Sequence, residues 1–213
     1  MRVRTAGEPL VPEEGGRFGQ GASSQLLLFI FLTAMTGAVA LIETRRLGLS
    51  RRMLSTPTPP RTVIVGEMLG RFGVALVQGV FIMVGSLLLF GVSWGDPVGA
   101  AALLAMFALV AAGAGMLVGS IFATEQQAVS IGILLGLGLG ALGGSMVPLE
   151  VFSDTMQTVA HVTPHAWALD GFADLANRGK GIGAIAPELG VLAVYAAVLL
   201  SAATWRLRRA ITG

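Results

Sequence analysis

Five arginines lie between the first two apolar stretches of the chain, in the segment ETRRLGLSRRMLSTPTPPR from Glu43 to Arg61. Guanidinium groups bind phosphates and carboxylates through paired N–H donors. Leucine and methionine side chains alternate with these arginines, which predicts a short basic segment at a membrane interface or in the groove of a partner protein. The segment is expected to end before Pro57, because proline disrupts helix continuation.

Two further groups of polar residues have spacings that could support chemistry. Glu67 and Arg71 are four residues apart and can face one another on a helix, where a local ion pair near the membrane boundary explains them. His161 and His165 are also four apart, with Asp170 nearby, which would suit a metal site or an acid–base pair. Pro164 breaks that spacing and no HExxH motif is present, so an ordinary loop location is the preferred interpretation.

The composition indicates an integral membrane protein. Hydrophobic residues make up 54% of the chain and charged residues 12%, with a mean hydropathy of +0.78. A membrane-spanning helix needs about 20 mainly apolar residues. Five stretches approach that length, which predicts an all-α protein with spans at Leu26 to Ile42, Phe72 to Val92, Val98 to Ala123, Ala128 to Val147 and Ile185 to Trp205.

The distribution of arginine predicts the orientation, because short loops rich in Lys and Arg remain in the cytoplasm. The segment 43–61 and the arginines after the fifth span, Arg206, Arg208 and Arg209, therefore mark the cytosolic side. Five spans then place the N-terminus outside and the C-terminus inside. Residues 1–22 are expected to form an external stub and residues 23–213 the membrane domain. The net charge of +2 reflects these arginines, and nucleic-acid binding is not expected.

Residues 148–184 form the longest predicted external connection. The sequence predicts two short helices separated at Thr163 and Pro164, with Thr163 as the cap of the second helix. Apolar residues such as Trp167 favour a shallow or re-entrant position in the outer leaflet, which requires protein cover or water around any irregular backbone. That position would suit the mouth of a translocation path.

The fourth predicted span carries glycines at a period of four: Gly132, Gly136, Gly140 and Gly144. Small residues at this spacing allow two membrane helices to approach closely. The ridge is interpreted as tight packing within one subunit, with a dimer seam or a sliding surface as alternatives.

Three segments of the chain resemble the permease subunits of type-2 ABC transporters. They are ETRRLGLSRRMLSTPTPPRTVIVGEMLG, LGGSMVPLEVF and VTPHAWALDGFADL. The first is similar to the family's acidic, basic, glycine and leucine-rich pattern before a new span. The second is similar to the glycine pair and proline that end the penultimate span, and the third to its external Thr-Pro and aromatic helix. With the span spacing, the resemblance extends from Ser23 to the C-terminus.

The resemblance implies a membrane subunit of an ATP-driven exporter, coupled to a separate ATP-binding subunit and paired with a second permease copy or homologue in the bilayer of a bacterial plasma membrane. ATP and Mg²⁺ are expected on the ATPase, and no cofactor or metal on this chain, which lacks a GxxxxGK[ST] motif. The implied ATPase-coupling residues are Glu43, Arg45, Arg46, Gly48, Arg51, Arg52, Leu54, Thr56 and Pro57. The implied external gate residues are Pro148, Thr163, Pro164 and Trp167.

The sequence departs from the family at its beginning. Family members usually have six spans, with a first helix and often an external domain before the matching region. The chain is therefore expected to be a fragment, a truncated product or half of a split permease. A non-transporting membrane scaffold is the alternative function, and an intramembrane enzyme is disfavoured because the spans contain no paired carboxylates, nucleophile with base, or metal cluster. The transported substrate is not identified by any run of polar residues.

Overall fold

The computed structural model describes residues 16–49, 52, 55, 57 and 59–212. In this part of the chain all regular secondary structure is helical, and five helices are long and apolar enough to cross a membrane. The prediction of an all-α protein with five spanning helices is confirmed. Arg51, Leu54 and Thr56 of the basic segment lie outside the described residues.

The helix bounds differ from the predicted spans mainly at their ends. The first span consists of α1 (Gly16–Thr36) and α2 (Ala38–Arg46), which are separated at Gly37. The other four are α4 (Pro60–Phe90), α5 (Pro97–Ile121), α6 (Glu125–Leu142) and α9 (Ala186–Thr212). α4 begins well before the predicted Phe72, because polar residues in its first turns do not prevent helix formation after Pro60.

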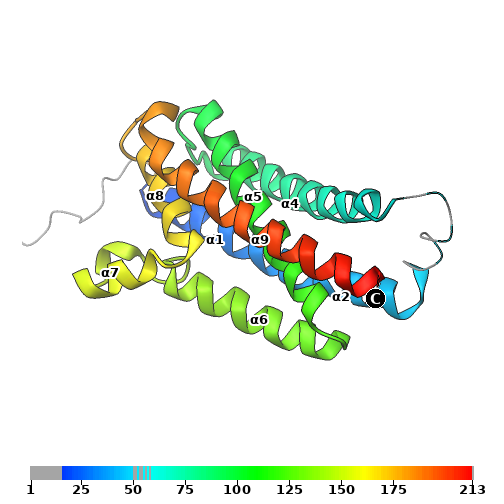
Figure 1. Ribbon diagram of the computed structural model, residues 1–213. Coiled ribbons are helices and arrows are strands. Elements are labelled where there is room, and N and C mark those ends of the chain that lie inside the picture. Colours follow the sequence, from blue (N-terminus) through cyan, green and yellow to red (C-terminus); the bar gives the residue numbers. More distant parts are fainter. Residues whose placement is uncertain (1–15, 50–51, 53–54, 56, 58, 213) are drawn as a thin grey trace, which may run out of the picture.

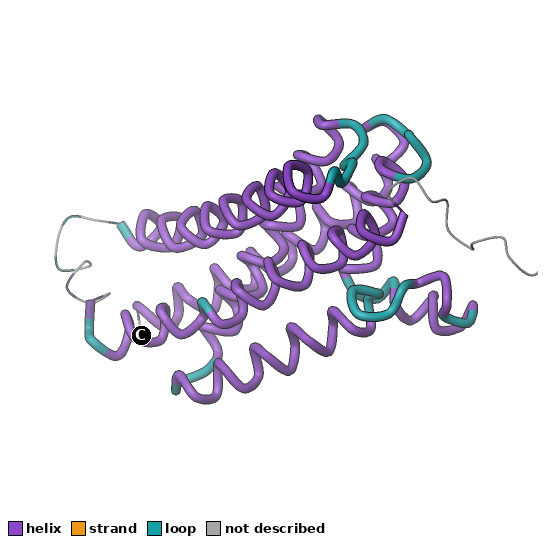
Figure 2. The backbone as a smooth tube through the Cα atoms, turned by 180° about the vertical axis from the view of Figure 1, so that it is seen from behind, coloured by secondary structure: helices purple, strands orange, loops and turns teal. Residues whose placement is uncertain are grey.

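The helices form an elongated bundle around α5 (Figures 1 and 2). α5 packs against α1, α2, α4 and α9, and its most apolar window is 67% buried, against 11% for α4. α4 and α6 lie on opposite sides of this centre (Figure 1). We call the end that holds the end of α2 and the starts of α4 and α6 the basic end. The opposite end, with the starts of α5 and α9, is the far end.

Capping residues explain several of these boundaries. Asp96 begins α5 by accepting a hydrogen bond from the Gly99 N–H at 3.1 Å, and it also accepts one from the Ile182 N–H at 3.2 Å. Thr124 caps α6 by accepting a bond from the Gln127 N–H. Short turns therefore join α4 to α5 and α5 to α6.

The far end carries the predicted pair of short helices, here α7 (Asp154–Ala160) and α8 (Pro164–Ala176). Two 3₁₀ turns flank them, η1 (Leu149–Val151) and η2 (Ile182–Ile185). The predicted break at Thr163 and Pro164 is confirmed. Thr163 occupies the N-cap position of α8 as predicted, but its side chain makes no capping bond, because its hydroxyl donates backward to the Ala160 carbonyl at 2.9 Å.

Candidate functional site

The described residues of the basic segment lie together at the basic end. Glu43, Arg45 and Arg46 belong to the last turns of α2, and Gly48 follows in a left-handed conformation with φ of 67°. A residue with a side chain is rarely found in that conformation, so glycine suits this turn. Arg52 donates its backbone N–H to the Gly48 carbonyl, and Pro57 lies in the turn before α4.

Arg45 points into the bundle. Its Nη1 donates to the carbonyls of Gly119 at 3.1 Å and Ser120 at 3.5 Å, which lie in the last turn of α5. The last carbonyls of a helix lack partners within the helix and carry partial negative charge, so a guanidinium group stabilises them. Arg45 therefore joins the end of α2 to the central helix.

The neighbouring side chains point outward. Arg46 forms an ion pair with Glu125 at 3.1 Å, yet its side chain is 75% exposed. Such exposed pairs contribute little to stability. Arg52 is also exposed, and Leu47 is 59% and Leu49 38% exposed. The basic end thus presents arginine and leucine side chains side by side, between two spanning helices.

Arg71 lies deeper in the bundle than these exposed side chains, beside the interruption of the first span at Gly37. Its Nη2 is 3.6 Å from Glu67 Oε2, which confirms the predicted pairing of these residues on one helix face. Arg71 Nη1 also lies 3.5 Å from where a Cβ would stand on Gly37, at the junction of α1 and α2. Sequence reasoning found the ion pair but missed the role of Gly37, because the contact depends on how α4 packs against the first span.

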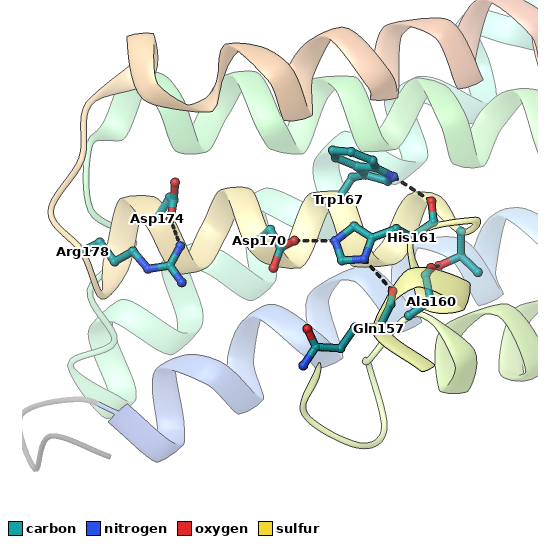
Figure 3. A network of polar contacts seen from close by, with 8 residues as sticks. Gln157, Ala160, His161, Trp167, Asp170, Asp174 and Arg178 are labelled. Carbon is teal, nitrogen blue, oxygen red and sulfur yellow. Dashed lines mark hydrogen bonds and ion pairs between the residues drawn. The ribbon is translucent and has the colours of Figure 1, made fainter. Parts of the chain in front are cut away.

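The four predicted gate residues lie together at the far end. Pro148 precedes η1, and Thr163 and Pro164 separate α7 from α8. The Trp167 indole N–H donates to the His161 carbonyl at 2.8 Å, and the indole meets the His161 ring edge to face at 5.1 Å (Figure 3). These contacts close the α7–α8 corner.

His161 joins the two short helices. Its Nδ1 lies 2.7 Å from the Gln157 carbonyl and its Nε2 lies 2.7 Å from Asp170 Oδ2 (Figure 3). Partial burial lowers the pKa of His161, but the two hydrogen bonds outweigh it, and the pKa lies above 6.5. The physical reason is that acceptors face both ring nitrogens, and both nitrogens donate only in the protonated ring.

His165 has different surroundings from His161, so the two histidines do not form one site. Its side chain is buried, and the rings of Phe31 and Phe107 meet it edge to face at 4.8 and 5.2 Å. Burial lowers the pKa of His165 to about 3, so the ring is neutral. Among the described residues no group of three or more metal-binding side chains occurs.

The glycine ridge of α6 packs within the subunit. Cβ atoms at Gly132, Gly136 and Gly140 would meet the side chains of Met35, Leu32 and Leu28 on α1. The fourth glycine does not belong to the ridge, because α6 ends at Leu142. Gly144 instead has φ of 92° and faces Leu149 and Leu169.

The chain is similar to the linearmycin resistance permease protein LnrN of Bacillus subtilis (strain 168), with 26% identity over 182 residues. The matching region covers 85% of this chain and 47% of that relative, so the chain spans about half of the relative's length. The model of the ABC-2 family transporter protein matches residues 12–205. This match includes the basic segment, the first four spanning helices, α9 as far as Trp205 and the α7–α8 corner, and the chain therefore belongs to the ABC-2 transporter family.

Proposed function

We propose that the chain is a membrane-spanning subunit of an ATP-driven exporter, with the basic end in the cytosol of a bacterial cell and the far end outside. A separate ATP-binding subunit docks on segment 43–61, and a second permease copy or homologue completes the substrate path. ATP and Mg²⁺ bind to the partner. Membership of the ABC-2 family supports the transport role, and the resistance function named for the relative supports export.

The observation that carries the docking role is the surface at the end of α2. Exposed Arg46 and Arg52 stand beside exposed Leu47 and Leu49. Lipid headgroups alone would satisfy the arginines. The combination of apolar anchors with charged neighbours also fits the groove of a protein partner.

The contacts behind this surface supply a route for coupling. Arg45 links the end of α2 to the last turn of α5, and α2 continues toward the break at Gly37. A partner that moves the basic segment would therefore move α2 and α5 together and change the angle between α1 and α2. Access would alternate between the two sides of the membrane as ATP is bound and hydrolysed by the partner.

Co-purification from the native membrane tests this proposal. We expect a tagged wild-type chain to recover an ATP-binding protein. The Arg52→Glu variant should lose most of it, because the reversed charge on the docking surface would repel the partner. Arg206→Glu is the matched control, since Arg206 is exposed near the end of α9, outside the basic segment. It should retain the partner.

Two outcomes would count against the proposal. Correctly inserted wild-type chain that recovers no ATPase would favour a membrane scaffold. Equal loss of partner in the Arg52→Glu and Arg206→Glu variants would indicate that the basic end acts only through its total charge. Protease accessibility of tags at the two termini checks insertion in every sample.

A further inference from the structure

A large chamber opens between α4 and the first span at the basic end. Its volume is about 960 Å³, near the upper limit of about 1,000 Å³ for small-molecule sites. Residues of α1, α2 and α4 line it, together with Leu49 and Arg52 from the basic segment. The helical rise of 1.5 Å per residue places Ala75, at its deep end, about 20 Å along α4 from Thr62 at its mouth.

The walls of the chamber are mostly small or apolar. Ile30, Val63 and Val74 contribute apolar surface, and Gly66 and Gly70 leave space where side chains would otherwise project. A Cβ added to Gly66 or Gly70 would meet nothing within 4 Å. Small residues therefore leave room on the mouth side of Arg71, and Val74, Ala75 and Ile30 give an apolar lining on the side away from the mouth.

One charged side chain faces this apolar space without sufficient partners. The Arg71 side chain is only 10% exposed, and its single ion-pair distance, to Glu67, is long at 3.6 Å. Arg71 Nε is buried and has no hydrogen-bond partner among the described residues. An unsatisfied buried donor is costly, and more so on a charged group. A ligand oxygen at this position would remove that cost.

The charges indicate which ligand fits. Arg71 and Arg52 contribute two positive charges to the lining and Glu67 one negative charge, so one positive charge remains uncompensated. A phosphodiester carries a single negative charge and presents two oxygens that match a guanidinium fork. A molecule with one phosphodiester and a long apolar tail would satisfy both parts of the chamber.

We propose that this chamber binds a phospholipid of the adjacent leaflet, with its phosphate on Arg71 and one acyl chain running past Val74 and Ala75 toward Ile30, on the side of Arg71 away from the mouth. This site shares Leu49 and Arg52 with the docking surface, and lipid binding there does not depend on transport. The lipid fills the space between α4 and the first span, beside the contact of Arg71 with the α1–α2 junction at Gly37.

Lipid binding to the purified full chain in detergent tests the site. Native mass spectrometry would titrate dioleoylphosphatidylglycerol against the wild type and two kinds of variant. Arg71→Gln removes the phosphate partner, and Gly70→Leu fills the chamber while keeping every charge. We expect each to weaken binding at least tenfold. Because Gly70 faces open space, the leucine variant should fold even if Arg71→Gln does not.

Matched controls lie on the same helix. Arg61 is exposed near the start of α4, and Gly85 faces open space, and neither lines the chamber. Arg61→Gln and Gly85→Leu should therefore bind the lipid as the wild type does. Equal binding by all four variants would overturn the proposal, because it would place the lipid on the general apolar surface.

Two competing ligands distinguish the parts of the molecule that are recognised. Dioleoylglycerol has the same chains without phosphate, and it should bind at least tenfold more weakly than the phospholipid. Inorganic phosphate lacks the chains and should not displace the phospholipid. If dioleoylglycerol bound as tightly as the phospholipid, the chamber would be an apolar cleft that does not recognise the phosphate. If inorganic phosphate displaced the phospholipid, Arg71 would be a binding site for a free anion.

Discussion

The α7–α8 corner at the far end and the chamber at the basic end differ in how their charged side chains are paired and in the space around their glycines. At the far end Asp174 is paired with Arg178 and Asp170 with His161 (Figure 3). Lys180 also pairs with Asp174. At the basic end Arg71 Nε lacks a hydrogen-bond partner among the described residues. Charged groups whose polar atoms all have partners within the chain hold its elements together, whereas a buried donor without a partner leaves a site for a ligand.

The space around the glycine residues differs between these two regions in the same way. A Cβ on Gly95 or Gly143 at the far end would collide with the protein, while one on Gly66 or Gly70 at the basic end would meet nothing. The surroundings of α8 are thus closely packed at these glycines, and the α4 wall of the chamber contains room.

The largest loss of stability is expected from a substitution of Gly95. This residue has φ of 71°, and a Cβ there would overlap the backbone carbonyl of Leu175. Gly95→Ala should therefore lower the free energy of unfolding by about 2–5 kcal/mol, from about 1–2 for the left-handed backbone and about 1–3 for the overlap. The thermal midpoint in detergent, or the yield of folded protein, measures this loss.

Gly91→Ala separates the two contributions to that loss. Gly91 also has positive φ, 65°, but a Cβ there would meet nothing within 4 Å. Its substitution should show only the smaller, backbone part of the loss. Equal losses at the two positions would contradict the inference that the backbone of α8 packs closely against Gly95.

A smaller effect is expected from the His161–Asp170 pair, and it depends on pH. The pKa of His161 is raised in the folded chain, so the pair's contribution is fully present below about pH 6.5 and is lost as pH rises through the raised pKa. Asp170→Asn should lower the thermal midpoint at about pH 5 and have little effect at about pH 8. Partial exposure limits the effect to about 1 kcal/mol or less.

A second substitution assigns that pH dependence to the pair. In a His161→Gln background the Asp170→Asn change should lose its pH dependence, because the titrating ring is gone. An Asp170→Asn effect that grows with pH, or one that persists without His161, would contradict the assignment. The readout is the difference in thermal midpoint between variants across the pH series.

Much of the fold follows from local patterns in the sequence. Apolar stretches predicted the five spanning helices, the Thr163–Pro164 pair predicted the break before α8, and the spacing of Glu67 and Arg71 predicted their contact. Each of these depends on a few neighbouring residues. The cytosolic position of the basic end and its docking role remain predictions.

The errors arose where a local pattern competes with tertiary packing. A period of four placed Gly144 on the ridge, but the chain turns after Leu142. Thr163 occupies the capping position, yet the nearer Ala160 carbonyl takes its hydroxyl. Nor does sequence separate Gly70 from Gly115, since each is a glycine within an apolar helix. One faces open space, and the other faces the backbone of Ala34.

Gly70 and Gly115 therefore give the finest test of the open and closed regions. Alanine favours a helix interior over glycine by about 0.5–1 kcal/mol. Because a Cβ at Gly70 meets nothing within 4 Å, Gly70→Ala should leave the thermal midpoint unchanged or raise it slightly. Gly115→Ala is the matched substitution within α5, where the new methyl would overlap the Ala34 carbonyl and force two helices apart. It should lower the midpoint, since overpacking costs about 1–3 kcal/mol. A loss of stability at Gly70 equal to that at Gly115 would mean that α4 closes against the first span in the folded protein.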